Sequence, residues 1–382
     1  MKFSIVLPVF NGELYLDDCL SSLALQEDFL NEILVIDDAS TDGTSDILTS
    51  WKTKLSTLKV ITNSQNQGVS SARNHGIKAA ISDWLIFVDA DDCLSKDYSA
   101  LVSQAITANP GACLIFGNYQ QIDDEAKPFG NPICSPSLEK SSLKGQLLVR
   151  NFITSTSGVA VKRTVLGKGF NESLTLAEDW ELWLRLAEQG EFIHLDEILV
   201  KLRRHQGNAS RDVSEMQRAV KKVLQGLSSE EIDDAVNARN LAKDQNLADL
   251  VSIYQTRDDW SLAHSLLADG LREYPDSADL HFYLGVFHYH HMNYLEAISA
   301  FKACILHALG HLAAKNNLAI CYLAENMIEE GREQLLQVTE ENPDYLDASH
   351  NLARCEEGIP FDGDYKMTAK PLRSTLIKYL KS

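Results

Sequence analysis

The sequence has no uninterrupted apolar run of the about 18 residues that a membrane-spanning helix needs, so we expect no transmembrane segment. Its first ten residues lack the apolar core and the small-residue cleavage site of a secretory signal peptide. Basic residues are few, because 35 Lys and Arg stand against 54 Asp and Glu. The resulting net charge of −19 argues against nucleic acid as a partner, since phosphate binding needs a basic surface.

Paired cysteines are also missing. The seven cysteines are scattered, none forms a C-x-x-C pair, and an odd number does not suit a disulfide framework. We therefore expect reduced thiols in a cytoplasmic protein. Peripheral contact with the inner face of a membrane is the alternative, because residues 366–382 contain five bases and no acids. A short amphipathic helix there, with Leu372, Leu376, Ile377 and Leu380, would touch an anionic membrane or, as we prefer, dock on the preceding helices.

The 382 residues are 45% hydrophobic and 23% charged, which is ordinary for a globular protein. At about 150 residues per domain, this length predicts two or three domains. The sequence pattern changes near residue 210. Before it, strand and helix patterns alternate, and after it, helix-forming residues predominate with few Gly and Pro. We therefore predict an α/β domain at residues 1–210, a helical linker at 211–243, helical repeats at 244–357 and a basic tail at 358–382.

The second half repeats at an interval of 34 residues. The position after each repeating leucine is small or modest in size, and larger apolar residues recur further on. Small residues let paired helices approach, so this pattern resembles the tetratricopeptide repeat. It predicts helix pairs at 244–277, 278–311 and 312–345 and a capping helix at 346–357, with a generic helical bundle as the alternative. The repeating leucines are Leu250, Leu284, Leu318 and Leu352.

In the first half, four short apolar runs read as buried strands separated by helical patterns. The strands are expected at residues 3–8, 32–37, 58–62 and 84–88. Repeated strand–helix units imply a mainly parallel sheet with helices on both faces. Ligands bind outside the carboxyl ends of such strands. The segments that follow the first, second and fourth strands, residues 8–11, 37–42 and 89–92, should therefore face one crevice.

Three carboxylates, Asp89, Asp91 and Asp92, directly follow the fourth strand. Carboxylates so close repel one another unless a cation is present, and oxygen ligands suit Mg²⁺ or Mn²⁺. An acidic loop that begins a helix is the alternative. No G-x-G-x-x-G follows the first strand and no P-loop motif is present, so a nucleotide site here needs another way to neutralise a diphosphate. A divalent cation would do so.

Five motifs in order resemble family 2 glycosyltransferases, which have the GT-A fold. The resemblance covers about residues 3–210 and rests on the motifs together, since each alone is weak. They are SIVLPVFN at residues 4–11, VIDDASTDGT at 35–44, QGVSSARNHG at 67–76, FVDADD at 87–92 and LAEDWELWLR at 176–185. A sixth segment, RRHQGNAS at 203–210, resembles the family's closing segment, with a flexible basic loop as the competing interpretation.

The resemblance implies a role for each matching residue. The uracil and ribose would be lined by Pro8, Phe10 and Asn11, the base would donate a hydrogen bond to Asp38, and Asp89 would contact the ribose. Gly68 would permit close backbone approach to the nucleotide and Arg73 would place a cation near it. Metal binding would involve Asp91, with Asp92 as a partner, and His205 would reach the metal or the diphosphate. Turn and capping roles are expected for Asp37, Asp42 and Thr44.

Asp179 is the candidate general base. Glycosyl transfer needs a carboxylate that takes the acceptor proton as the acceptor oxygen attacks the anomeric carbon. For inversion this base lies opposite the leaving diphosphate, so it should come from a segment other than the metal loop, and Asp179 is about 90 residues downstream of Asp91. Glu178 would orient the site. The alternative is an acidic pair that favours a helix dipole.

The resemblance therefore predicts an inverting glycosyltransferase that moves a single sugar from a nucleotide sugar, with uridine as the favoured base, to a glycan or protein acceptor in cell-envelope polysaccharide synthesis. The QxxRW motif of the membrane-embedded processive synthases is absent. The repeats would recruit a protein, as acceptor or as partner, or would instead dimerise the enzyme or pack on the first half. A repeat scaffold with an inert nucleotide-sugar-binding domain is the alternative. A nucleotidyl transferase would need a basic loop after the first strand, and residues 9–18 contain no Lys or Arg.

Overall fold

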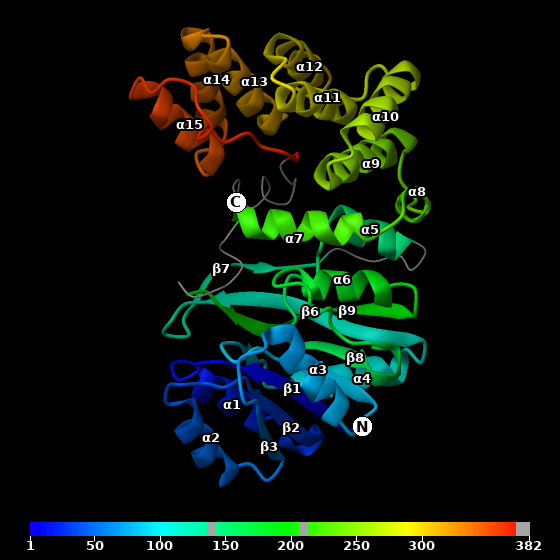
Figure 1. Cartoon of the computed structure of the whole chain (residues 1–382), viewed down its shortest axis with the longest axis vertical. Helices are drawn as coiled ribbons and strands as arrows, with labels where there is room; N and C mark the ends of the chain where they lie inside the picture. The colour runs from blue at the N-terminus through cyan, green and yellow to red at the C-terminus, as the bar shows by residue number, and fades with distance from the viewer. Residues whose placement is uncertain (136–141, 206–212, 372–382) are drawn as a thin grey trace. The chain divides into compact units, whose positions relative to one another are not determined.

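The structure, a computed structural model, describes residues 1–135, 142–205 and 213–371. It forms two compact units, Met1–Ser228 and Ser229–Ser382 (Figure 1). The segment expected as a linker is divided between them, because helix α7 (Val213–Gln225) belongs to the first unit and α8 (Ser229–Asn237) to the second. Lys222 on α7 donates a 2.7 Å hydrogen bond to the carbonyl of Ser173 within the first unit. None of the described helices combines the length and apolar character needed to cross a membrane.

One sheet forms the centre of the first unit. Its nine strands within the described residues are ordered β3-β2-β1-β4-β8-β6-β9-β5, with β7 beside β6. Leu58–Thr62 occupies its predicted bounds, and the other predicted strands agree within two residues. The strands are β1 (Phe3–Val9), β2 (Leu30–Asp37), β3 (Leu58–Thr62), β4 (Trp84–Phe87), β5 (Cys93–Leu94), β6 (Ala112–Ile122), β7 (Pro128–Ile133), β8 (Val159–Lys162) and β9 (Glu191–Arg203).

The sheet is mixed. Strands β3, β2, β1 and β4 are parallel, as the strand–helix pattern predicted, and β6 is parallel to β9. Strand β8 lies between β4 and β6 and is antiparallel to both. The expectation of a mainly parallel sheet therefore describes the N-terminal part, while the sequence after residue 110 did not reveal the antiparallel strands. They bring the start of β8 and the end of β9 next to the acidic loop after β4.

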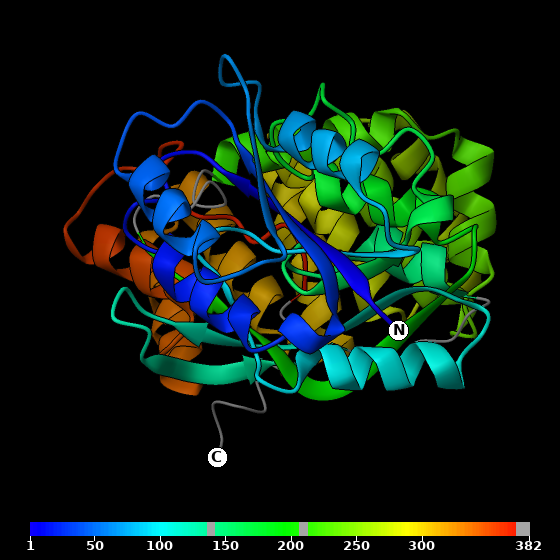
Figure 2. The same ribbon diagram turned by 90° about the horizontal axis from the view of Figure 1, so that it is seen from below.

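Helices cover both faces of the parallel strands (Figure 2). Alternate residues of β1 point to opposite faces, so Ile5 and Leu7 pack into a core with α1, while Val6 faces α3. Gly76 lets α3 approach closely, because a Cβ atom there would lie 2.4 Å from Val6 Cγ1. This close contact holds α3 against the strand ends. The helices of the unit before α7 are α1 (Leu16–Ala24), α2 (Thr44–Lys52), α3 (Val69–Ala79), α4 (Tyr98–Ala108), α5 (Leu143–Val149) and α6 (Glu178–Leu186).

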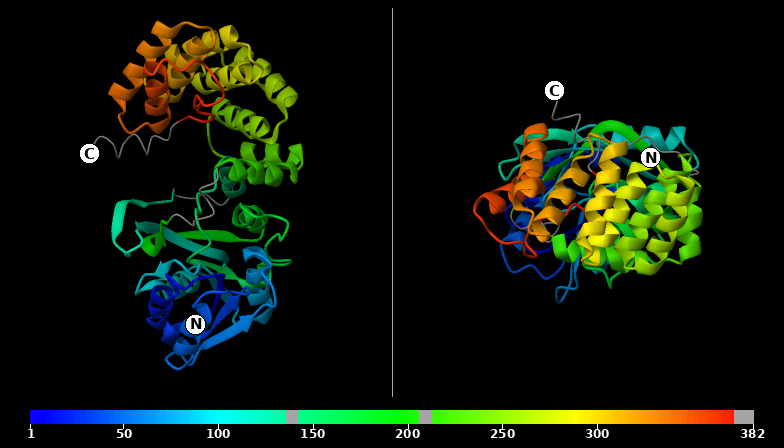
Figure 3. Two further views of the ribbon diagram at one scale, coloured as in Figure 1. Left: turned by 60° about the vertical axis from the view of Figure 1, so that its left-hand side comes forward. Right: turned by 90° about the horizontal axis from the view of Figure 1, so that it is seen from above.

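The second unit contains the three predicted helix pairs and the predicted final helix. Figure 3 shows them as a curved array. Small residues sit where the repeat pattern predicts close approach: a Cβ atom on Gly285 would lie 2.5 Å from the Phe301 ring, and one on Gly331 would lie 2.8 Å from Leu323. The pairs are α9 (Lys243–Arg257) with α10 (Trp260–Glu273), α11 (Ala278–His290) with α12 (Tyr294–His307), and α13 (Leu312–Ala324) with α14 (Ile328–Glu341), followed by α15 (Leu346–Glu356).

Candidate active site

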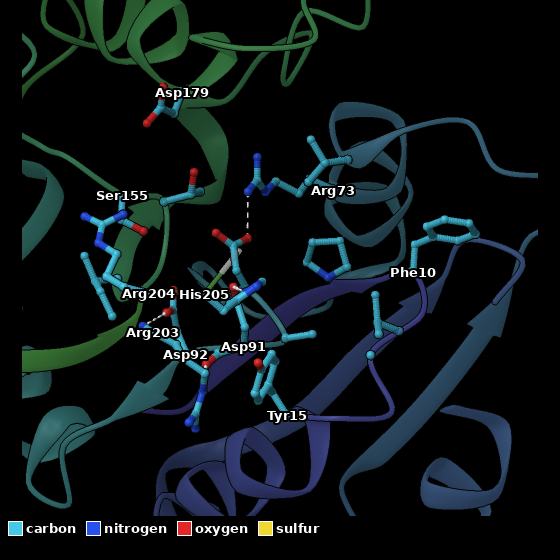
Figure 4. A pocket seen from close by; sticks show the side chains of 18 of the residues that line it. Phe10, Tyr15, Arg73, Asp91, Asp92, Ser155, Asp179, Arg203, Arg204 and His205 are labelled. Carbon is cyan, nitrogen blue, oxygen red and sulfur yellow. Dashed lines mark hydrogen bonds and ion pairs between the residues drawn. The ribbon is translucent and has the colours of Figure 1, made fainter. Parts of the chain in front are cut away.

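A cavity of about 870 Å³ opens at the carboxyl ends of β1 and β4 (Figure 4). Its wall comes from the loops after β1 and β4, from α3, from residues 154–156, from the start of α6 and from the end of β9. Two of the predicted site residues, Asp38 and Gly68, are not part of this wall. The other ten line it: Pro8, Phe10, Asn11, Arg73, Asp89, Asp91, Asp92, Glu178, Asp179 and His205.

Arg73 connects two walls of the cavity. Its Nη2 donates to Asp89 Oδ1 at 2.7 Å, and its Nη1 donates to Glu178 Oε1 at 2.8 Å. The side chain is only 4% exposed and lies over the Phe170 ring. Although burial disfavours the charge, the carboxylates of Asp89 and Glu178 raise the pKa of Arg73 above its ordinary value. Arg73 therefore lies at the predicted site, but its charge is balanced by protein carboxylates.

Asp91 and His205 form the pair that could hold a cation. His205 Nε2 lies 3.0 Å from Asp91 Oδ2, and both side chains are partly exposed to the cavity. Burial and the charge of Asp89 raise the pKa of Asp91. Within the described residues, no group of three or more Asp, Glu, His or Cys side chains is arranged to hold an ion. One carboxylate and one imidazole still fit a cation such as Mg²⁺ or Mn²⁺, which takes its remaining ligands from phosphates and water.

Asp92 serves a different purpose from the predicted metal contact. Its Oδ2 accepts a 2.5 Å hydrogen bond from the Ser157 hydroxyl, and its Oδ1 accepts one of 2.9 Å from the Arg203 amide. The residue is only 4% exposed, and burial together with the charges of Asp91 and Asp89 raises its pKa well above the usual range. Because both oxygens are engaged, Asp92 anchors the acidic loop to the antiparallel strands.

Arg203 and Ser157 are site residues that the sequence reasoning missed. Arg203 is buried, and its guanidinium donates to the Asp91 carbonyl at 3.0 Å and to Asp18 Oδ2 at 2.8 Å. Ser157 Oγ accepts the Asp89 amide at 2.8 Å. These contacts fix the backbone of the acidic loop. The sequence pattern gives Arg203 only a place in a basic segment, and no motif surrounds Ser157.

Arg204, the residue after Arg203, is partly exposed rather than buried. It lines the cavity, and among the described residues no ion-pair partner is found for its side chain. Its amide donates to the Ile122 carbonyl at 2.9 Å, which holds the backbone while the side chain remains in the cavity (Figure 4). Arg204 is therefore a cation available to an anionic ligand. The rest of the basic segment, residues 206–210, lies outside the described residues.

Asp38 is buried and does not line the cavity. Its Oδ1 accepts from Asn63 Nδ2 at 2.7 Å, and its Oδ2 accepts the amides of Gln67 and Gly68 at 2.9 and 2.8 Å. A carboxylate with three protein donors and 3% exposure is not accessible to a nucleotide base. The predicted contact with the base therefore does not fit this structure. Asp38 instead fixes the loop that leads into α3, and Gly68 enters that loop with φ +87°.

The loop after β1 is joined to the loop after β2. Asn11 Oδ1 accepts the amide of Thr41 at 2.8 Å, and the Asn11 backbone adopts a left-handed φ of 53°. Thr44 donates its hydroxyl to Asp42 Oδ1 at 2.5 Å, which fits the expected turn. The expected capping role is not confirmed, because α2 begins at Thr44 and its N-cap is Gly43, without a side-chain cap hydrogen bond. Phe10 stays 49% exposed at the edge of the cavity (Figure 4). The result is a hydrogen-bonded rim with one exposed aromatic face.

Asp179 lies in the first turn of α6, across the cavity from Asp91 and His205 (Figure 4). The preceding Ala177 adopts a left-handed conformation with φ 58°, which is rare for a residue other than glycine and is found at strained functional positions. Asp179 Oδ1 accepts the Trp180 amide at 2.6 Å. Burial, together with the neighbouring Glu178 carboxylate, raises the pKa of Asp179 to about 7. This carboxyl can therefore gain or lose a proton near neutral pH.

Comparison with known proteins agrees with this architecture. Residues 4–170 match the model of glycosyl transferase family 2, and residues 290–355 match a tetratricopeptide repeat. Residues 4–170 form a family 2 glycosyltransferase domain. The first unit thus contains this match on a mixed sheet with a GT-A-like fold, and an all-helical unit with the repeat match follows it.

Two curated relatives share parts of the chain. The chondroitin synthase of Escherichia coli is 27% identical over 207 residues, which are 54% of this chain and 29% of that protein. The poly(ribitol-phosphate) beta-glucosyltransferase of Bacillus spizizenii is 42% identical over 102 residues, which are 25% of this chain and 16% of that protein. The chain thus spans less than a third of the length of either relative.

One solved structure resembles the fold of this chain over most of its length. The crystal structure of S. aureus TarS 1–349 in complex with UDP-GlcNAc has a TM-score of 0.50 and 17% identity. The match covers 96% of this chain and 98% of that one. At this identity the likeness concerns the fold alone.

Proposed function

We propose that this protein is an inverting glycosyltransferase that moves one sugar from a uridine-linked nucleotide sugar to a glycan or protein acceptor. The observation that carries the proposal is the place and the pKa of Asp179. This carboxyl shares a cavity with the Asp91–His205 pair but comes from a different element, and its pKa of about 7 leaves a basic carboxylate near neutral pH. A general base works best when its pKa lies near the working pH.

The donor would lie along the rim formed by the loops after β1 and β4. Phe10 offers an exposed aromatic face to the base, and Asp89 keeps 29% of its side chain exposed for a ribose hydroxyl. Arg204 supplies a positive charge to the diphosphate. Asp91 and His205 would hold Mn²⁺ or Mg²⁺, which neutralises the charge that develops on the leaving diphosphate.

The acceptor would approach from the side of α6. Asp179 takes the proton of the acceptor hydroxyl while the acceptor oxygen forms a bond to the anomeric carbon. The bond from that carbon to the diphosphate breaks on the opposite face, so the configuration inverts. The ion pair between Glu178 and Arg73 holds the first turn of α6, and it thereby orients Asp179.

The relatives favour a polymer as the acceptor, since they are named a chondroitin synthase and a poly(ribitol-phosphate) beta-glucosyltransferase. We extend this class of acceptor to the present chain and place it in cell-envelope polysaccharide synthesis.

A panel of nucleotide sugars, assayed with Mn²⁺ and with a chelator, tests the proposal. We expect release of nucleoside diphosphate that depends on the metal and is lost in Asp91→Asn. The matched control is Asp97→Asn, because the Asp97 side chain is 66% exposed and lies outside the cavity. The anomeric configuration of the product, read by NMR, tests inversion. If calorimetry shows no binding of uridine diphosphate in the presence of Mn²⁺, the result favours the alternative of a repeat scaffold with an inert nucleotide-sugar-binding domain.

A further inference from the structure

The chain turns back onto the repeat unit after α15. Residues 361–371, here called the strap, run along the inner side of the curved helix array (red in Figures 1 and 3). Phe361, Tyr365 and Met367 contact an apolar cluster formed by α13, α14 and α15. The described part of the C-terminal segment thus docks on the last repeat. Residues 372–382, which contain the apolar positions named above, lie outside the described residues.

Two asparagines bind the backbone of the strap in the same way. The Lys366 amide donates to Asn351 Oδ1 at 2.7 Å, and Asn351 Nδ2 donates to the Lys366 carbonyl at 3.0 Å. The Thr368 amide donates to Asn317 Oδ1 at 2.9 Å, and Asn317 Nδ2 donates to the Thr368 carbonyl at 2.8 Å. Each carboxamide thus satisfies both backbone groups of one residue, and the bound residues alternate along the strap.

The spacing of these asparagines follows the repeat. Asn317 and Asn351 are 34 residues apart, which places them at the same position of successive repeats. Both are fully buried, as is Asn316, whose Nδ2 also donates to the Lys366 carbonyl at 3.1 Å. Buried carboxamides are costly unless they are hydrogen-bonded, and here an extended backbone supplies the partners. The arrangement is therefore a built peptide site rather than incidental contact.

Side chains add selectivity to this backbone recognition. The Thr368 hydroxyl donates to Asp347 Oδ2 at 2.9 Å and bonds with the Tyr345 hydroxyl. The strap thus places a hydroxyl residue against α15.

We propose that the inner face of the repeat unit is a binding site for an extended peptide that carries a hydroxyl residue, and that residues 365–370 occupy it in cis. A partner segment of the same chemistry binds by displacing the strap. Because the strap is tethered, its effective concentration is on the order of millimolar, so it weakens every competing peptide. The inference does not depend on the proposed glycosyl transfer.

Binding of a labelled synthetic peptide with the sequence of residues 361–371 tests this site on the full chain by fluorescence anisotropy. We compare wild type with a strap-release variant, Tyr365→Ala/Met367→Ala/Thr368→Ala. The variant should bind the peptide at least about tenfold more tightly, because the cis competitor is weakened. Adding Asn317→Ala and Asn351→Ala should abolish the gain. A control peptide with Thr368→Pro lacks the backbone N–H that donates to Asn317 Oδ1, so it should not bind. Equal affinity of wild type and the release variant would overturn the proposal.

Hydrogen exchange of wild type provides a readout that does not depend on how the variants fold. The amides of Lys366 and Thr368 should be protected, while that of Gly363 should exchange quickly. Exchange of the first two amides at unprotected rates would overturn the site. If their protection falls on dilution, the strap is exchanged between two copies and the cis assignment is wrong.

Discussion

Arg73 and Glu178 form a 2.8 Å ion pair that joins α3 to the first turn of α6. The same guanidinium binds Asp89 of the acidic loop at 2.7 Å, so one buried cation connects the segment proposed for the donor to the segment that carries Asp179. Arg73 therefore contributes directly to the relative position of the two halves of the candidate site.

Replacing Arg73 should impair both stability and turnover. Arg73→Ala leaves the buried Glu178 carboxylate and Asp89 without their partner, and removal of one member of a buried pair costs about 3–5 kcal/mol. Urea unfolding should show this loss, and kcat should fall more than donor affinity. Lys78→Ala on the exposed face of α3 is the control and should change neither. Unchanged stability of Arg73→Ala would contradict the central role of this cation.

Asp179→Asn should keep the affinity for the donor and lower kcat by about 10² or more, which is the usual scale of general-base catalysis. Affinity is measured by calorimetry with uridine diphosphate. Turnover is measured as sugar transfer to the true acceptor. Glu181→Gln is the matched control, because Glu181 lies on the same helix but pairs with Arg185 outside the cavity. Near-normal turnover of Asp179→Asn would remove the base assignment.

The pH dependence of kcat should follow Asp179. Because burial and Glu178 raise the pKa of this carboxyl to about 7, the active carboxylate form gains population as the pH rises through 7. We expect kcat to rise across this range and the inflection to vanish in Asp179→Asn. The sign for stability is opposite: a carboxyl with a raised folded-state pKa stabilises the fold below its unfolded pKa, and this contribution is lost as the pH rises through 7.

Ala177→Gly should stabilise the protein slightly. A left-handed residue with a Cβ costs about 1–2 kcal/mol, and glycine relieves most of this while losing more conformational entropy on folding. We expect a gain of up to about 1 kcal/mol in thermal or urea unfolding. Ala187→Gly at the other end of α6, where φ is −58°, should instead destabilise. A loss of stability in both variants would show that Ala177 is not strained.

Gly285→Ala should destabilise the repeat unit. Its Cβ would lie 2.5 Å from the Phe301 ring, so helices α11 and α12 must separate. Overpacking of this kind costs about 1–3 kcal/mol. Gly310→Ala is the control, since a Cβ atom there meets no atom within 4 Å. Guanidinium unfolding of the two variants measures the difference.

Local patterns predicted the helix repeat and the parallel strands well, because both depend on spacing along the chain. The 34-residue register located every helix pair within a few residues. Prediction failed where contacts join distant segments. The oxygens of Asp92 and Asp38 look available in the sequence, but Ser157, Arg203 and the loop before α3 engage them in the structure.

The sequence by itself determined that a glycosyltransferase domain precedes tetratricopeptide repeats, because motif order and repeat period are properties of the chain. It also placed most of the candidate site residues at the ends of predicted strands. In a parallel sheet these ends lie at one edge. Only the tertiary structure decided which carboxylates remain accessible and that the strap docks on the inner face of the repeat unit. These outcomes depend on which donors lie within hydrogen-bond distance of each buried oxygen, and such neighbours come from segments up to 111 residues apart.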